Sequence, residues 1–168
     1  MSWNIEESTP NVEEIDEVYW GLREQAFNIT PADLHITLDV GEKHQVYAAV
    51  IDMPVNNAIS TLVCMFDGTT SLYFSNGGAI LGAGQKHETV AKATREFLFS
   101  SGQAVPFMQK MTEYPLPTTK EATVYLKCGE GVFSAQINME EKQTEIHKEF
   151  LDFLIQRVLN ALRDSNEL

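Results

Sequence analysis

Four glycines within eight residues mark the one stretch of this chain whose residue types and spacing could form a binding site. Glycine permits positive φ and the close approach of a ligand or a second backbone. A helix that begins after such a turn also offers unpaired N–H groups and a positive dipole end to a phosphate or carboxylate. This interpretation predicts a phosphate- or nucleotide-like ligand. Its contacts would be Ser75, Asn76, Gly77, Gly78, Gly82, Gly84 and His87.

Tight packing is the second interpretation of the same glycines, and the pattern favours it. The spacing is neither G-x-G-x-x-G nor a loop ending in G-K-[ST], and no basic residue lies between Gly77 and Gly84. Asn76-Gly77 is ordinary turn chemistry, and Gly82 and Gly84 would let a helix approach a sheet closely. A Gly82→Val, Gly84→Val double variant separates the two interpretations. Loss of folding would support packing, whereas a folded protein that has lost its ligand would support a site.

Recognisable catalytic and metal-binding patterns do not occur in the sequence. The serine before Asn76-Gly77 lacks the preceding glycine of a G-x-S-x-G elbow. The histidines belong to neither H-E-x-x-H nor H-x-H, and they are His35, His44, His87 and His147. Cys64 and Cys128 each lie in a strand-like run, which predicts buried, reduced thiols. We therefore expect no catalytic residue, metal or cofactor, and enzymatic activity is the less favoured interpretation.

Composition and charge narrow the classes of partner. The 168 residues suit one domain, residues 1–168. Twenty-four acidic residues against twelve basic ones give a net charge of −12, which repels nucleic acid and anionic membrane but suits a basic protein. No apolar run approaches the roughly eighteen residues of a membrane span, and the start Met1–Glu7 is unlike a signal peptide. These features predict a soluble, cytoplasmic protein.

Hydrophobic periodicity places the elements of the first half. Apolar residues at intervals of three and four predict a first helix that is capped by Ser8 or Thr9 and ends near Asn28. Alternation and β-branched content predict four strands in an antiparallel meander, with Asp67-Gly68 as a hairpin turn and a break over Met53–Asn57. The strands are Leu34–Leu38, Val46–Asp52, Thr61–Phe66 and Ser71–Ser75.

The second half predicts a helix, a hairpin and a final helix. One helical stripe runs across residues 86–112, so we expect a single helix that Gly102 and Pro106 kink. Tyr114–Pro117 then forms an extended link. Beyond the link we expect the strands Glu121–Cys128 and Val132–Ile137 and a helix over Glu140–Arg163. The element order αββββαββα predicts an α+β fold with a mostly antiparallel sheet of five or six strands and three helices. Profilin-like and roadblock-like domains share this order of elements.

The glycine turn and its surroundings also carry a resemblance. The run Ser71–Val90, with Pro115-Leu116-Pro117 and the Val124–Ile137 hairpin, resembles a pattern in small bacterial proteins of uncharacterised function. The likeness covers about half of the chain, residues 60–137. It implies that the strand, glycine turn and helix are a shared feature. It brings no activity, cofactor or partner.

Binding is the function that these observations favour. Catalytic motifs are absent, and the elements carry more aromatic and aliphatic residues than one core stripe each requires. We expect a non-catalytic domain that binds another protein or self-associates into a homo-oligomer. One alternative is a small-molecule-binding or enzymatic domain that uses the Gly77–Gly84 turn. Another is an acidic immunity-type inhibitor of a basic toxin, since complementary charge speeds encounter.

Overall fold

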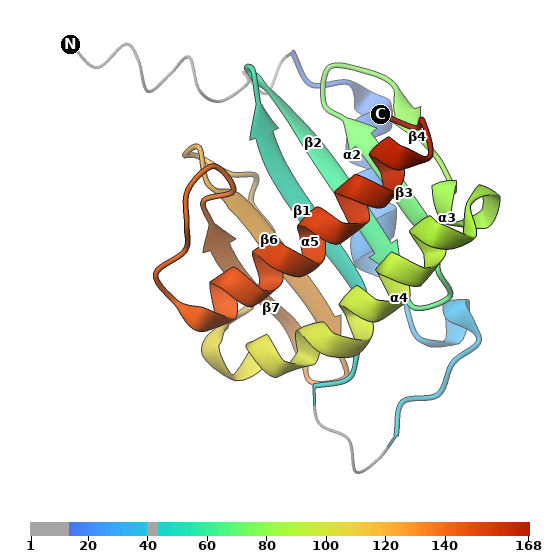
Figure 1. The fold of residues 1–168 in the computed structure, drawn as a ribbon, viewed down its shortest axis with the longest axis vertical. Coiled ribbons are helices and arrows are strands. Elements are labelled where there is room, and N and C mark those ends of the chain that lie inside the picture. Colours follow the sequence, from blue (N-terminus) through green and yellow to red (C-terminus); the bar gives the residue numbers. More distant parts are fainter. Residues whose placement is uncertain (1–13, 40–43) are drawn as a thin grey trace.

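One antiparallel sheet organises the computed structural model, which describes residues 14–39 and 44–168. Its strand order is β4-β3-β2-β1-β6-β7-β5 (Figure 1). The strands are β1 Val46–Val55, β2 Ala58–Met65, β3 Thr70–Phe74, β4 Ala79–Ile80, β5 Gln109–Met111, β6 Ala122–Cys128 and β7 Gly131–Ile137. The helices are α2 Glu17–Asn28, α3 Ala83–Lys86, α4 Glu88–Ser101 and α5 Ile146–Asp164, with 3-10 turns η2 Ala32–Leu34 and η3 Gly102–Phe107.

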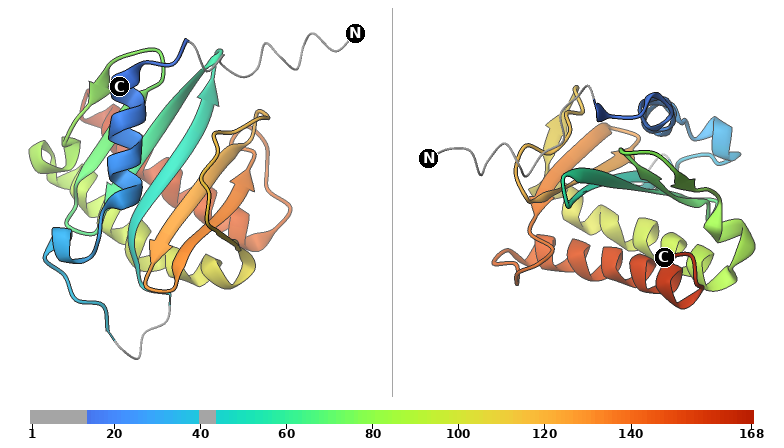
Figure 2. Two further views of the ribbon diagram at one scale, coloured as in Figure 1. Left: turned by 180° about the vertical axis from the view of Figure 1, so that it is seen from behind. Right: turned by 90° about the horizontal axis from the view of Figure 1, so that it is seen from above.

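Helices cover both faces of the sheet. Figure 2 shows α2 on one face and α4 and α5 side by side on the other. Strand side chains alternate between the faces, so Ile51 and Leu126 pack under α4 and α5 while Val50 and Tyr125 pack under α2. Residues 112–121, which we call the link, cross β6 and β7 on the face of α2 (Figure 2). The α+β class and the antiparallel sheet are confirmed.

The turn between β1 and β2 corrects the predicted break at Met53–Asn57. β1 runs on to Val55, and Asn56 and Asn57 make the turn with φ of 48° and 63°. Asparagine tolerates this left-handed conformation. Across a two-residue turn Val55 and Ala58 exchange both backbone hydrogen bonds, and such pairs alternate along the ladder. The backbone nitrogen of Pro54, which carries no hydrogen, therefore faces away from β2. Pro54 also lies beyond the last β1–β6 pair, Asp52↔Thr123, so neither neighbouring strand needs a donor at this position.

The predicted strand over Leu34–Leu38 is wrong. Residues 32–34 form η2, and His35 follows with a φ of 58°. The cause is local, because the Thr30 amide donates to the Asp33 carboxylate and the Asp33 amide donates back to Thr30 Oγ1. Such side-chain bonds favour a turn over a ladder. The fourth strand of the meander is instead β4, which pairs with β3.

Both ends of the predicted first helix can be compared with α2. The carboxylate of Asp16 accepts from the Val18 amide at 2.7 Å, so Asp16 caps the helix. The helix therefore begins after the predicted start, and the proposed caps Ser8 and Thr9 lie outside the described residues. The predicted end at Asn28 is confirmed.

The single kinked helix over residues 86–112 is also wrong. The segment forms α3, α4, η3 and β5 in succession. Helix α4 ends at Ser101, where the chain passes into η3. Gly102 lies against the His44 carbonyl, where a Cβ would overlap the oxygen, so this position requires glycine. Pro106 lies in the 3-10 turn, and the next three residues then join the sheet beside β7. The described residues thus hold seven strands and four α-helices rather than five or six strands and three helices.

The last helix begins later than predicted. It starts at Ile146 rather than Glu140 because the preceding residues bond to one another. The Glu140 amide donates to Asn138 Oδ1, and the Gln143 carboxamide bonds to both backbone groups of Asn138. Side-chain bonds of this kind hold an irregular loop against helix formation.

Two further observations concern the cysteines and membrane insertion. Cys64 and Cys128 are free and buried, as their strand-like context predicts. No helix within the described ranges has the length and apolarity that crossing a bilayer requires.

Candidate functional site

The first half of the glycine turn is a β-hairpin between β3 and β4. Gly77 and Gly78 have φ of 110° and 91°, and the Gly77 amide donates to the Phe74 carbonyl at 3.0 Å. Ser75 is buried, and its Oγ accepts from the Ile59 amide at 2.8 Å. Its carbonyl accepts from the Asp16 amide at the start of α2. Ser75 thus joins β2, β3 and α2, and Asn76 is exposed beside it.

The second half of the turn packs α3 against the neighbouring hairpin. Gly82 has a φ of 65°, and its amide donates to Ser71 Oγ at 3.0 Å. Gly84 is buried against the turn at Gly68, where a Cβ would overlap the Gly68 carbonyl oxygen. His87 Nε2 lies 3.0 Å from the Glu167 carboxylate near the chain end. These contacts account for the glycines by packing, and ligand binding at the turn stays a prediction.

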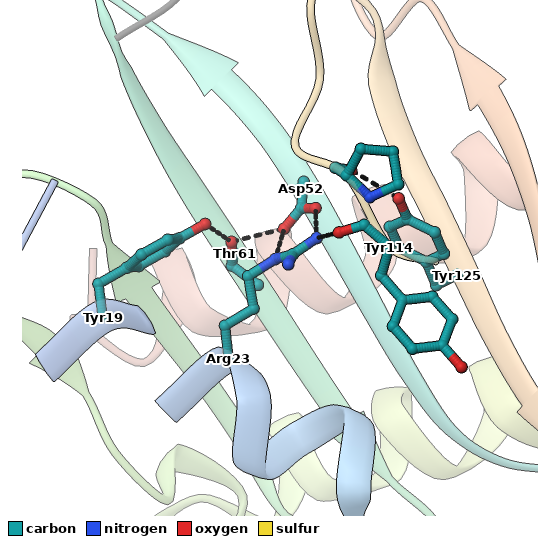
Figure 3. Close-up of polar contacts among 7 residues, drawn as sticks. Tyr19, Arg23, Asp52, Thr61, Tyr114 and Tyr125 are labelled. Carbon is teal, nitrogen blue, oxygen red and sulfur yellow. Dashed lines mark hydrogen bonds and ion pairs between the residues drawn. The ribbon is translucent and has the colours of Figure 1, made fainter. Parts of the chain in front are cut away.

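A polar network lies buried between α2 and the centre of the sheet (Figure 3). Arg23 and Asp52 are only 5% and 0% exposed. Arg23 Nη2 donates to Asp52 Oδ2 at 2.7 Å and to the Tyr114 carbonyl at 2.9 Å, and its Nε donates to Asp52 Oδ1 at 3.2 Å. Thr61 Oγ1 donates to the same Oδ1 at 2.7 Å and lies 2.6 Å from Tyr19 Oη.

Aromatic rings surround the guanidinium of this network. Its carbon lies 4.8 Å from the centre of the Phe27 ring, and the Phe27 and Tyr114 rings stack at 4.2 Å. Arg23 therefore joins α2, β1 and the link in one contact set, and both oxygens of Asp52 have partners. The arrangement resembles an acid–base cluster, but its polar atoms form hydrogen bonds with one another and with the backbone of the link. We interpret it as a structural network.

Tyr125 on β6 predicts a loss of stability at alkaline pH. Burial, and then the charge of Asp52, raise the pKa of Tyr125 to about 12. An unfolded tyrosine titrates near 10, so the unfolded chain loses this proton first, and the free energy of unfolding falls as pH rises from about 10 to about 12. We expect this residue to account for a loss of about 2–3 kcal/mol. Urea unfolding across that range measures it.

The control for this alkaline effect is Tyr125→Phe. Its stability at neutral pH should be lower, because Tyr125 Oη donates to the Pro115 carbonyl at 2.6 Å. Its decline above pH 10 should nevertheless be shallower than that of the wild type. Equal slopes would show that Tyr125 does not titrate differently in the two states.

Lys127 on β6 is a buried cation that caps the end of α2. Its Nζ donates to the carbonyls of Ala26 and Phe27 in the last turn of that helix and to the carbonyl of Ile29 just beyond it. Burial lowers the pKa of Lys127 to about 8. The ammonium group of Lys127 lies at the negative end of the helix dipole, and its N–H donors are bonded to the three carbonyls. We therefore assign Lys127 a structural role and not a role in an open site.

Two adjoining cavities lie beside β5 and β7, at one edge of the sheet, and together they form the candidate site. The first, which we call the edge cavity, has a volume of about 480 Å³, and its lining includes Leu116, Thr123, Tyr125, Ser134 and Gln136. The second, which we call the helix cavity, has a volume of about 610 Å³ and is lined by Gln103, Ala104, Phe107, Glu145, Ile146, His147 and Phe150. Phe107, Glu145 and His147 line both.

Large apolar side chains stand open to solvent at the helix cavity. Phe107 is 69% exposed and Ile146 is 86% exposed. The ring of His147 stacks on Phe107, with centroids 5.4 Å apart. The polar groups there lie close to one another, since Glu145 lies 3.4 Å from Lys148 Nζ and 3.8 Å from His147 Nδ1. The surface around the helix cavity that has no contact partner among the described residues is therefore mainly apolar.

Sequence reasoning missed this site because it depends on where elements end. Phe107 was expected inside a long helix, but α4 stops at Ser101 and leaves Phe107 at the end of η3. Ile146 lies well inside the predicted helix Glu140–Arg163, but it begins α5 and is exposed. The available signal was the surplus of apolar residues over one core stripe per element.

No protein-family model, curated protein or solved structure matches the chain. The resemblance of the glycine turn to small bacterial proteins stays a prediction. Within residues 14–39 and 44–168, no three His, Cys, Asp or Glu side chains are grouped so that they could share a metal ion.

Proposed function

We propose that this protein is a non-catalytic binding domain that holds another protein at the edge and helix cavities. The observation that supports it is the exposure of Phe107 and Ile146 beside a cavity of about 610 Å³. Exposed apolar groups around a concavity mark interaction sites, and aromatic anchors at the centre of an interface contribute most of its binding energy. A protein partner that buries these two side chains would remove them from water.

The polar groups of the site suit the rim of an interface. Glu145, His147 and Lys148 line the cavities and lie close to one another, and Tyr125, which also lines the edge cavity, donates to the Pro115 carbonyl. Glu145, His147 and Lys148 form a polar rim beside an apolar centre, which is the arrangement of a protein interface.

A photo-crosslinking amino acid at position 146 tests the proposal in cells that naturally produce the protein. We expect illumination to give a discrete heavier product that contains a second protein. The matched control is position 18, because Val18 is 67% exposed on α2, on the opposite face of the sheet. That position should give no such product. Equal crosslinking at both positions, or none at 146, would contradict the proposed site, and a product of twice the chain mass would identify a second copy as the partner.

A further inference from the structure

The outer side of α4 and α5 carries a row of exposed apolar side chains. The sheet lies on one side of these two helices, and no described element covers their other side (Figure 2). Phe99 on α4 is 84% exposed, and Phe153 on α5 is 55% exposed. Together with Phe107 and Ile146 they make up four of the eight described large apolar side chains that are more than half exposed. We call these four residues the apolar row.

The register of α4 against α5 places Phe99 beside Phe153. The two helices run side by side in opposite directions (Figure 1), and Glu96 Oε2 lies 2.9 Å from Arg157 Nη2 between them. Phe99 follows Glu96 by three residues and Phe153 precedes Arg157 by four, so both lie about one turn from this ion pair in the same direction. The guanidinium carbon of Arg157 also lies 5.9 Å from the centre of the Phe153 ring.

The other two residues continue the apolar row to the helix cavity. Ile146 precedes Phe153 by seven residues, about two helical turns, so it lies on the same side of α5. Phe107 stacks on His147, the neighbour of Ile146, and both Phe107 and Ile146 line the helix cavity. At two heights along the helix pair, an apolar residue of α4 or η3 thus lies beside an apolar residue of α5.

The same two helices have no net formal charge, although the chain is strongly acidic. They hold five of its twenty-four acidic residues and five of its twelve basic ones. These residues are Glu88, Lys92, Arg95 and Glu96 on α4, and Lys148, Glu149, Asp152, Arg157, Arg163 and Asp164 on α5. The net charge of −12 therefore lies on the rest of the chain. That remaining surface attracts a basic protein and repels a second copy, so a second copy can approach closely only through α4 and α5.

We propose that the partner protein is a second copy of this chain, and that the two copies pack α4 and α5 against each other as a four-helix bundle. This proposal rests on the proposed function and names its partner. The twofold axis lies between the copies and runs parallel to the helices. Rotation about this axis keeps every residue at its height along the bundle. It sets α4 of each copy opposite and antiparallel to α5 of the other, as neighbouring helices lie in four-helix bundles.

This axis makes the outer side of α4 and α5 complementary to itself. Each α4 side chain meets, in the other copy, the same α5 residue that lies beside it in its own chain. Phe99 therefore lies opposite Phe153 of the other copy, and Phe107 lies opposite Ile146. Glu96 lies opposite Arg157 of the other copy, so the two ion pairs form a square in which the signs alternate. Apolar groups meet apolar groups and opposite charges meet, which is the complementarity of a specific interface.

The size of the helix pair suits a dimer. With its 19 residues α5 is about 28 Å long, and two packed helices are about 20 Å wide. The outer side therefore measures about 560 Å² on each copy before the relief of the side chains is counted, and the pair of copies reaches the 1,000 Å² or so that a specific interface buries.

Two charge-reversal variants of the full-length protein test the dimer and its register by sedimentation velocity. Glu96→Arg makes both groups of the ion pair positive, and Arg157→Glu makes both negative. Each variant alone brings four like charges together, so we expect the dissociation constant of its dimer to rise at least about tenfold. An equimolar mixture of the two should sediment as a dimer, because every charged contact between the copies then joins opposite signs. Circular dichroism checks that each variant is folded.

A pair of surface variants tests the apolar contact in the same measurement. Phe99 lines neither cavity and is mostly exposed, so Phe99→Asp leaves the candidate site and the core intact. It should raise the dissociation constant of the dimer at least about tenfold, because an aromatic side chain at the centre of an interface carries much of its binding energy. Val18→Asp is the matched control, since Val18 is 67% exposed on α2, on the opposite face of the sheet. It should leave the dimer unchanged.

The outcomes separate this proposal from the proposed function. A wild-type protein that stays monomeric up to about 100 μM overturns the dimer, and the proposed site then stands if position 146 crosslinks to a protein of another mass. A dimer that withstands Phe99→Asp and both charge reversals forms through another surface, which also overturns the proposal. A mixture that stays monomeric overturns the register of Glu96 opposite Arg157. If the dimer responds as expected but position 146 gives no crosslink, the dimer stands and the proposed site at the cavities falls.

Discussion

Arg23→Met is expected to lower the free energy of unfolding by about 3–5 kcal/mol, which is the cost of leaving a buried charge without its partner. Asp52 is fully buried, and Arg23 supplies two of the hydrogen bonds to its carboxylate. The methionine side chain keeps the apolar contacts with Phe27 but donates no hydrogen bond. The Tyr114 carbonyl also loses its donor, which loosens the link. Urea unfolding followed by circular dichroism measures the difference.

A surface ion pair gives the matched control for this variant. Arg95 lies 2.7 Å from Glu88 and both side chains are exposed, so Arg95→Met should cost less than about 1 kcal/mol. The double variant Arg23→Met, Asp52→Leu removes both buried charges. It should recover a large part of the lost stability, because an apolar pair of similar volume often replaces a buried ion pair without loss. A double variant no more stable than Arg23→Met would show that the charge pair is not the cause.

Gly84→Ala is expected to lower the free energy of unfolding by about 3 kcal/mol, at the upper end of the range for overpacking. A Cβ at this position would overlap the Gly68 carbonyl oxygen, which is backbone and cannot rotate away. Either α3 or the β2–β3 hairpin must then shift. Thermal and urea unfolding of the variant measure the cost.

Gly21→Ala is the control for the second prediction, because a Cβ at Gly21 meets no atom within 4 Å. Gly21 lies within α2, where alanine should raise stability by about 0.5–1 kcal/mol. The two variants add the same methyl group and should change stability in opposite directions. If Gly84→Ala is as stable as the wild type, close packing does not explain this glycine, and the ligand-binding interpretation of the turn becomes the stronger one.

Turn residues and hydrophobic periodicity in the sequence predicted those elements whose formation depends on residues close together in the chain. Asp67-Gly68 lies at the predicted hairpin turn, and part of the predicted stripe over residues 86–112, namely Val90, Thr94 and Phe97, lies on the buried face of α4. Alternation failed at Leu34–Leu38, because the mutual bonds of Thr30 and Asp33 favour a turn that a period-two pattern does not reveal. β5 was missed because its three residues are strand only through pairing with β7.

The candidate site could not be predicted for a related reason. The glycine turn attracted attention because glycines signal unusual backbone, but here that backbone serves a hairpin and a close helix contact. The cavities instead depend on β5 beginning only at Gln109 and on η3 turning away from the sheet. The point at which a short edge strand begins has no signature in composition or periodicity. It becomes visible only when register and strand ends are known together.

The pairing of β1 with β6 at the middle of the sheet has a consequence for how the chain folds. β1 and β2 are neighbours in sequence and can pair early, whereas β6 reaches β1 only after α3, α4, η3 and β5 have been synthesised. Such non-local pairing slows folding, because a long loop must close before its contacts form. During synthesis one edge of β1, an almost entirely buried strand in the final protein, is therefore exposed. Chaperone binding during translation should accordingly be strongest before residue 128 leaves the ribosome and weaken once β6 is available.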